Sequence, residues 1–284
     1  MSVGMVEVGQ KPLEYKYKFT VGTLVTNLAQ YQNCVRSIQA AGFDDEDCQF
    51  LYIDNSAQNN HSAFGGLNHI LNHAEGEYII LCHQDVLFDF DGRGKLEKCL
   101  SELDGVDPAW AVAGNAGGVA MSRLAMRITD PHGDNQNTKN FPQLVDTLDE
   151  NFMVLKSSNR MAFSADLNGF HFYGTDICLL ADVQGYRSYV IDFHLRHLSA
   201  GNKSASFFKN ENELTAKYAR AFRSRWVRTT CSVIYMSGNP LAVYVQSKFG
   251  QSMPVVLHRW GLIKGLFKNI GSMFNGKPVA SRSR

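Results

Sequence analysis

The sequence lacks long apolar runs, paired cysteines and any acidic residue after Glu213. No stretch of its 284 residues approaches the ~20 apolar residues that cross a bilayer. The N-terminal MSVGMVEVGQ has no apolar core of the kind found in signal peptides. The six cysteines form no CxxC pair, which argues against a disulfide framework or a zinc ribbon. We therefore expect a cytoplasmic protein with reduced thiols.

The usual phosphate-binding loops are also missing. No GxxxxGK[ST] sequence occurs, and GNAGG (114–118) lacks the GxGxxG spacing of dinucleotide-binding folds. These absences argue against P-loop nucleotide hydrolysis and against a dinucleotide cofactor.

Charge is divided unevenly along the chain. Residues 214–284 carry twelve Lys and Arg and no acid, whereas residues 1–213 carry sixteen basic and twenty-seven acidic residues. This division indicates that the C-terminal part meets an anionic partner. Because that part has no recognisable nucleic-acid-binding motif, we expect no nucleic acid among the partners.

Strand-like and helix-like segments alternate over the first two thirds of the chain. Apolar strands are predicted at 17–26, 49–54, 77–82 and 109–114, with amphipathic helices between them. The alternation predicts an α/β fold with a mostly parallel sheet covered by helices on both faces. The polar stretch 127–143 is predicted to be a surface loop. The predicted domains are an N-terminal segment (1–16), a catalytic domain (17–205) and a basic, helical C-terminal extension (206–284).

Two of the predicted strands end on polar side chains. The second ends at Asp54, and the third runs through YIILC into His83, Gln84 and Asp85. In parallel α/β sheets, ligands bind beyond the carboxyl ends of the strands. We therefore expect these side chains at the rim of a cleft.

Three stretches together resemble the family 2 glycosyltransferases of the GT-A fold. They are TLVTNLAQYQNCVRSIQAAGF, YIDNSAQNNHSAFGGLNHILNHAEGEYIILCHQDV and GFHFYGTDICLLADVQGYRSYVIDFHLRHLSAG, within residues 18–202. The resemblance implies a metal held by His83, Asp85 and His197, with His194 as the competitor of His197. It implies that Asp176 deprotonates the acceptor. The nucleotide of the donor would be bound by Thr26, Asp54, Asn68 and Gln84.

The sequence departs from the family pattern at two places. His83 replaces the first acid of the DxD motif, and GLN (66–68) lacks the basic residue that often begins the corresponding helix in the family.

Gly117 could let the backbone approach the donor sugar. Asp149 and Glu150 could bind sugar hydroxyls or lie in a solvated turn. Asp176 could also serve structure only, as a helix cap.

The expected function is that of an inverting, metal-dependent glycosyltransferase. It would move a sugar from a nucleotide-sugar, with a UDP-sugar favoured, to a glycan hydroxyl, and the cofactor would be Mn²⁺ or Mg²⁺. The resemblance implies surface-polysaccharide synthesis on a lipid-linked acceptor. The alternatives are a sugar nucleotidyltransferase and a non-catalytic nucleotide-sugar-binding protein.

Residues 255–284 carry an apolar stripe beside Lys and Arg. Trp260, Ile263, Phe267 and Ile270 recur at helical spacing. Such a helix suits the surface of an anionic membrane, which would make the enzyme peripheral on the cytoplasmic face. The stripe could equally pack on the protein itself, so both interpretations stay open here.

Overall fold

A computed structural model describes residues 13–44, 46–121, 123–201 and 203–249. The chain divides into two compact units, residues 1–214 and 215–284. The predicted tail helix at 255–284 lies outside the described residues. No described helix has the length and apolar content that crossing a bilayer requires.

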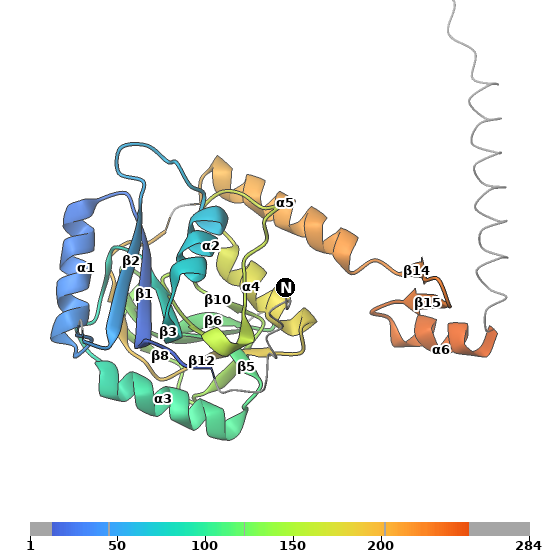
Figure 1. Ribbon diagram of the computed structural model, residues 1–284, viewed down its shortest axis with the longest axis horizontal. Helices are drawn as coiled ribbons and strands as arrows, with labels where there is room; N and C mark the ends of the chain where they lie inside the picture. The colour runs from blue at the N-terminus through green and yellow to red at the C-terminus, as the bar shows by residue number, and fades with distance from the viewer. Residues whose placement is uncertain (1–12, 45, 122, 202, 250–284) are drawn as a thin grey trace, which may run out of the picture. The chain divides into compact units, whose positions relative to one another are not determined.

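The first unit has the mixed α/β architecture that the alternating pattern predicts (Figure 1). Its strands are β1 (Tyr17–Val25), β2 (Cys48–Asp54), β3 (Gly76–Cys82), β4 (Val86–Leu87), β5 (Trp110–Gly114), β6 (Ala116–Val119), β7 (Arg123–Asp130), β8 (Gly133–Asn137), β9 (Gln143–Val145), β10 (Thr147–Leu148), β11 (Phe152–Lys156), β12 (Arg187–Val190) and β13 (Leu195–His197). Its helices are α1 (Leu28–Ala40), α2 (Ala63–His73), α3 (Arg93–Val106) and α4 (Tyr173–Val183), with a 3₁₀ turn at Ser157–Asn159.

The central sheet has the strand order β2-β1-β3-β11-β5-β12-β9. β1 pairs in parallel with both β2 and β3, and β5 pairs in parallel with β12. β11 enters between β3 and β5 and is antiparallel to both, and β9 is antiparallel to β12. Five of the seven strands therefore run in one direction, and their carboxyl ends lie at the same edge of the sheet.

Helices cover both faces of this sheet. α1 and α3 bury Cys34, Ile38 and Leu96 in the same core cluster as Phe19 and Ile80 of the strands. α2 packs on the opposite face, where Gly22 of β1 leaves room for Ile70: a Cβ at position 22 would lie 2.4 Å from Cγ2 of Ile70. α1 begins directly after Asn27, whose side chain accepts hydrogen bonds from two N–H groups of the first turn.

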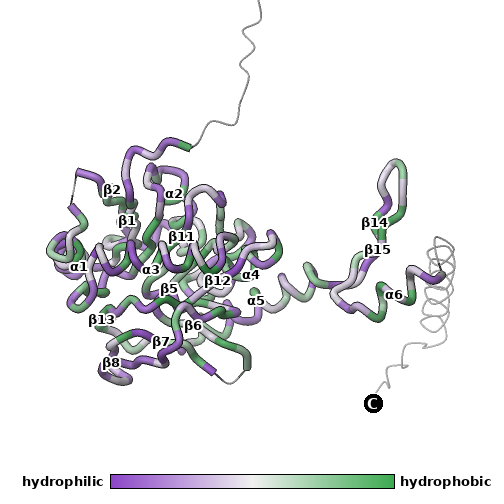
Figure 2. Tube along the Cα trace, turned by 90° about the horizontal axis from the view of Figure 1, so that it is seen from below, coloured by the Kyte–Doolittle hydropathy of each residue, from purple (hydrophilic) through white to green (hydrophobic). Residues whose placement is uncertain are grey.

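The prediction of a surface loop at 127–143 is wrong. β7 and β8 form an antiparallel hairpin there, with Arg127 opposite Asn137. The turn is closed by Oδ1 of Asp130, which accepts the N–H groups of His132 and Gly133. β8 is hydrophilic throughout, as its purple colour shows (Figure 2), so it carries none of the apolar alternation that marks a half-buried strand. Backbone pairing rather than burial holds it in the sheet.

The C-terminal extension is not entirely helical in its described part. α5 (Ala205–Ala221) is followed by an antiparallel hairpin of β14 (Arg225–Arg228) and β15 (Val233–Met236), and then by α6 (Pro240–Phe249). The stretch ENELTAKYARAFRSRWVR (211–228) has the pattern of one basic amphipathic helix, but the helix ends at Ala221 and a strand begins at Arg225. Trp226 of β14 packs on Tyr235 of β15, with ring centroids 5.0 Å apart, and this cross-strand pair favours the hairpin.

Candidate active site

β3 delivers His83 and Asp85 to the carboxyl-end edge of the central sheet. The strand ends at Cys82, the N–H of His83 still donates to the carbonyl of Asn151, and a tight turn then leads into β4. β4 pairs antiparallel with β13, which places His197 opposite Val86. Residue 197 is more than a hundred positions after 83 and 85 in the sequence and is brought to them by this short pairing.

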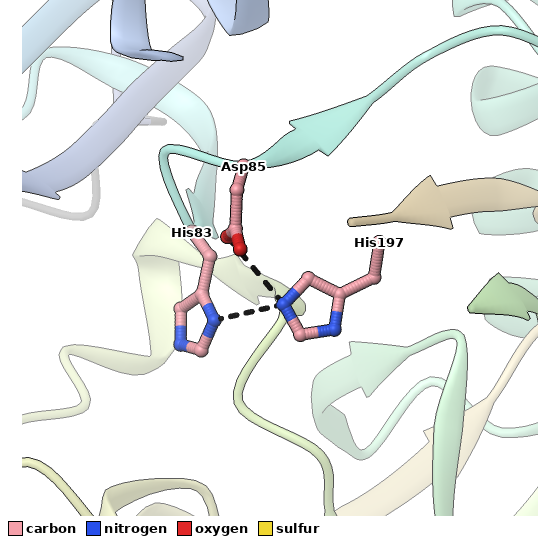
Figure 3. A group of neighbouring side chains, drawn as sticks. All are labelled: His83, Asp85 and His197. Carbon is pink, nitrogen blue, oxygen red and sulfur yellow. Dashed lines mark hydrogen bonds and ion pairs between the residues drawn. The ribbon is translucent and has the colours of Figure 1, made fainter. Parts of the chain in front are cut away.

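The side chains of His83, Asp85 and His197 point toward one another (Figure 3). Each offers a ligand atom, and these atoms all lie within 4.8 Å of one another. Nε2 of His197 is 3.4 Å from Oδ1 of Asp85 and 3.4 Å from Nδ1 of His83. Ligand atoms at this separation can share a divalent cation at about 2.1 Å from each. The three residues predicted to bind a metal therefore form one cluster with suitable geometry.

The cluster is shielded from solvent, since the side chains of His197 and Asp85 are only 11% and 14% exposed. Burial by itself would raise the pKa of Asp85, but hydrogen bonds from His197 and Ser199 and the nearby imidazoles lower it to about 2. Burial and the neighbouring His197 lower the pKa of His83. At neutral pH the site thus offers an ionised carboxylate and a neutral imidazole, which are the protonation states that bind metal.

Tyr173, the first residue of α4, fixes the orientation of the His83 ring. Its hydroxyl lies 2.7 Å from Nε2 of His83 and 3.4 Å from the carbonyl oxygen of Glu150. Burial raises the pKa of Tyr173 well above its ordinary value, so the hydroxyl keeps its hydrogen. A carbonyl can only accept, so the hydroxyl donates to Glu150 and accepts from Nε2–H of His83. Nδ1 then keeps its lone pair and faces the cluster.

His194, the competitor of His197, is used in the fold instead. It is buried, its ring stacks on Phe90 with centroids 3.9 Å apart, and its Nε2 lies 2.9 Å from the hydroxyl of Thr129. Both the face and an edge of the imidazole are occupied by these contacts. Among the described residues, His197 is therefore the histidine that joins His83 and Asp85.

The four residues predicted to bind the nucleotide fall into two groups. Thr26 and Asp54 end the neighbouring strands β1 and β2 and are exposed at the rim. Gln84 is partly buried: its Oε1 accepts the N–H groups of Thr26 and Asn27 at 2.8 Å, and its amide donates to the hydroxyl of Thr26. The side-chain amide of Asn68 donates to the carbonyl of Phe163 and accepts the N–H of Phe163, both at 2.9 Å. Gln84 and Asn68 thus hold the loops around the site, whereas Thr26 and Asp54 can reach a ligand.

Asp176, the predicted base, lies in α4 and is completely buried. One carboxylate oxygen accepts the N–H of Ser164 at 2.8 Å, and the other accepts its hydroxyl at 2.7 Å. These bonds tie the loop before α4 to the helix. Asp176 does not cap α4, whose N-cap is Phe172, so the predicted helix-cap role is not the one it has. Its role as the base stays a prediction.

The three residues proposed for the sugar lie close to α4 or to β10. Gly117 is needed for close packing, because a Cβ there would lie 2.4 Å from the carbonyl oxygen of Thr147. Asp149 is exposed and accepts the backbone N–H and side-chain amide of Asn151. Glu150 lies in the turn between β10 and β11, and its Oε1 accepts the N–H of Gly174, in the first turn of α4, at 3.2 Å. Burial and the charge of Asp149 raise the pKa of Glu150 to about 8, despite the N–H groups of α4, which lower it.

Sequence patterns did not single out Tyr173, Ser164 or Ser199 as parts of this region. Tyr173 and Ser164 are buried, and Ser199 places its hydroxyl 3.2 Å from Nε2 of His197. Tyr173 stands two residues before Thr175 in the YGTD motif, but nothing in that spacing indicates a contact with His83. The contacts of Tyr173 with His83, of Ser164 with Asp176 and of Ser199 with His197 are visible only in the three-dimensional structure.

No protein-family model matches the chain. A crystal structure of S. aureus TarS 1-349 in complex with UDP-GlcNAc has a TM-score of 0.44 and 12% identity, over 71% of this chain and 66% of that one. The crystal structure of A197 from STIV has a TM-score of 0.35 and 13% identity, over 61% and 81%. Likenesses of this size carry no conclusion about function.

One curated relative is considerably more similar. It is the Fuscovulum blasticum protein named "ATP synthase subunits region ORF 6", with 32% identity over 226 residues, which are 78% of this chain and 91% of the relative. The similarity extends over nearly the whole of that protein. The chain therefore belongs to the same family as ATP synthase subunits region ORF 6 of Fuscovulum blasticum.

Proposed function

We propose that the protein is a metal-dependent glycosyltransferase with a GT-A type catalytic unit. The observation that carries this proposal is the convergence of His83, Asp85 and His197 beyond the carboxyl end of β3. The exposed residues Thr26 and Asp54 end the two adjacent strands of the same edge. A cation site beside an exposed strand-end rim suits a ligand that combines a diphosphate with a nucleoside.

His83, Asp85 and His197 would hold the cation, and Tyr173 would orient the His83 imidazole through its outer nitrogen, Nε2. When bound, the cation supplies Lewis-acid stabilisation of the negative charge on a diphosphate leaving group. Two nitrogen ligands and one carboxylate favour Mn²⁺ over Mg²⁺, because Mg²⁺ prefers an all-oxygen shell. Asp54 is ionised, since hydrogen bonds from Ser56 lower its pKa, and its carboxylate can accept hydrogen bonds from a ribose.

The donor is proposed to be a UDP-sugar and the acceptor a glycan hydroxyl, with inversion at the anomeric carbon. Direct displacement inverts the anomeric centre and needs only one carboxylate to take the acceptor proton. This scheme rests on the resemblance of the three sequence motifs to family 2 glycosyltransferases.

A lipid-linked acceptor and an anionic membrane surface are proposed for the C-terminal extension. Residues 215–249 carry Lys and Arg but no Asp or Glu. Leu241 and Tyr244 of α6 are 68% and 59% exposed. Basic charge combined with exposed apolar side chains is suited to the interface of an anionic bilayer.

Binding of Mn²⁺ followed by electron paramagnetic resonance tests the proposal. The full chain should bind Mn²⁺, and UDP should alter the spectrum of the bound ion because diphosphate oxygens enter its coordination shell. The variant Asp85→Ala should lose both effects. The variant Asp91→Ala is the matched control. Asp91 lies in the segment after β4, accepts a hydrogen bond from the backbone N–H of His194 and is outside the His83, Asp85 and His197 cluster. An unchanged Mn²⁺ spectrum in Asp85→Ala would contradict the proposed site.

A further inference from the structure

The carboxylate that takes the acceptor proton must meet the acceptor within hydrogen-bond distance, about 2.6–3.2 Å. Asp176 is 0% exposed, and both of its oxygens accept hydrogen bonds from Ser164. An acceptor could reach it only if the loop that carries Ser164 moved away from α4. Asp176 in this position is a structural residue.

Glu150 lies on the turn beside the proposed metal ligands, together with Asp149, whose charge acts to raise the pKa of His83. Glu150 immediately precedes Asn151, whose carbonyl accepts the N–H of His83 at 3.0 Å. The hydroxyl of Tyr173 lies between Nε2 of His83 and the carbonyl of Glu150. As a residue Glu150 is partly exposed, whereas Asp176 is completely buried.

Gly174 creates the space in which the Glu150 side chain lies. A Cβ at position 174 would be 2.4 Å from the carbonyl oxygen of Leu148 and 3.1 Å from Cγ of Glu150. Any side chain at 174 would therefore displace the strand end or the carboxylate. The glycine also presents its N–H to Oε1 of Glu150, which fixes the direction of the carboxyl group at the start of α4.

From these contacts we propose that Glu150, and not Asp176, is the general base of the transfer reaction. The inference rests on the proposed glycosyltransferase function and assigns one residue within it. The titratable groups that face Glu150 are Asp149, which raises its pKa, and Tyr173, which stays neutral and hydrogen-bonds both the backbone carbonyl of Glu150 and His83. A base that titrates near neutral pH combines a usable ionised fraction with a useful affinity for the proton.

In the proposed step, the carboxylate of Glu150 removes the proton of the acceptor hydroxyl. The acceptor oxygen forms a bond to the anomeric carbon, and the bond from that carbon to the diphosphate oxygen breaks. The nucleoside diphosphate leaves with the electron pair of the broken bond. Glu150 then releases its proton to solvent, and no oxidant or reductant is involved.

Three variants of the full chain test the assignment: Glu150→Gln, Asp176→Asn and the control Glu102→Gln. Glu102 lies on α3 and is 55% exposed in an ion pair with Lys98, so its replacement should leave activity unchanged. The measurements are Mn²⁺-dependent UDP binding, and release of UDP from UDP-glucose, UDP-galactose or UDP-N-acetylglucosamine as a function of pH.

Glu150→Gln should bind UDP and Mn²⁺ as the wild type does, but turn over at least ~10²-fold more slowly and lose the pH-dependent rise in rate. Asp176→Asn should act mainly on stability, with turnover per folded molecule within ~10-fold of wild type. The inference is overturned if Glu150→Gln keeps wild-type turnover, or if folded Asp176→Asn binds UDP but shows the ~10²-fold loss instead. Failure of the wild type to bind Mn²⁺ and UDP would refute the proposed function itself, and the base assignment with it.

Discussion

Replacing Glu150 with Gln should stabilise the protein at alkaline pH, although the same change removes the proposed base. The Gln side chain keeps an oxygen that can accept the N–H of Gly174, so the local geometry is preserved. It removes an ionisable group that the folded protein holds in an unfavourable environment. Opposite effects on stability and on activity are typical of a group whose environment serves catalysis.

The magnitude follows from the pKa of Glu150, which burial and the charge of Asp149 raise from 4.5 to about 8. Below the lower value the group is protonated in both the folded and the unfolded state. Between the two values the unfolded chain ionises it while the folded protein keeps the proton, so the stability of the wild type falls as the pH rises. One pKa unit corresponds to ~1.36 kcal/mol, which makes the loss at most about 5 kcal/mol above the folded-state pKa.

Urea unfolding in EDTA at about pH 5 and about pH 9 measures this difference directly. Glu150→Gln should be nearly as stable as the wild type at the lower pH and more stable by up to about 5 kcal/mol at the higher pH. The control Glu102→Gln should show no such pH-dependent difference, because Glu102 is exposed. An equal stability difference at both pH values, or a less stable Glu150→Gln at the higher pH, would refute the argument that the fold raises this pKa.

Four further predictions follow from the site and the extension. Tyr173→Phe should fold normally but bind Mn²⁺ about 10-fold or more weakly, measured by isothermal titration calorimetry, because outer-shell partners orient ligating histidines; unchanged affinity would exclude Tyr173 as an orienting residue. His197→Ala should lose Mn²⁺ binding in the same assay, whereas His194→Ala should lower the melting temperature, since His194 packs on Phe90. The product anomer, determined by NMR, should be inverted relative to the donor, and a retained anomer would contradict single displacement. Truncation after Gln251 removes six of the twelve Lys and Arg that follow Glu213, and it should weaken co-sedimentation with anionic liposomes while the protein stays folded; unchanged binding would remove the tail from the membrane proposal.

The sequence predicts the central part of the fold because its signals there are local. The apolar runs of β1, β2, β3 and β5 and the Asn27 cap of α1 are each readable within a few residues. β11 was missed although FMVLK is an apolar run, because it follows a polar segment and enters the sheet antiparallel between two parallel strands. The β7–β8 hairpin could not be predicted from hydropathy, since β8 buries almost no apolar surface.

The candidate site was only partly predictable for a related reason. His83 and Asp85 follow a strand directly, so their place at the sheet edge can be inferred from sequence. The choice of His197 over His194 depends on β4 and β13, strands of two and three residues whose pairing no local pattern indicates. The burial of Asp176 depends on Ser164, which folds back onto α4 from the irregular loop that precedes the helix. Exposure of a carboxylate is a property of tertiary packing, and a motif alone does not contain it.

The most direct test of the central claim is turnover of a panel of nucleotide-sugars by the full chain, with Mn²⁺ and with excess EDTA. UDP-, GDP- and dTDP-sugars should be included, with release of the free nucleoside diphosphate as the signal. A metal-dependent glycosyltransferase centred on His83, Asp85 and His197 should release the diphosphate from one donor class with Mn²⁺, lose that activity in EDTA, and lose it again in Asp85→Ala. Equal turnover in EDTA, or wild-type turnover by Asp85→Ala, would contradict a metal-dependent transferase at this site.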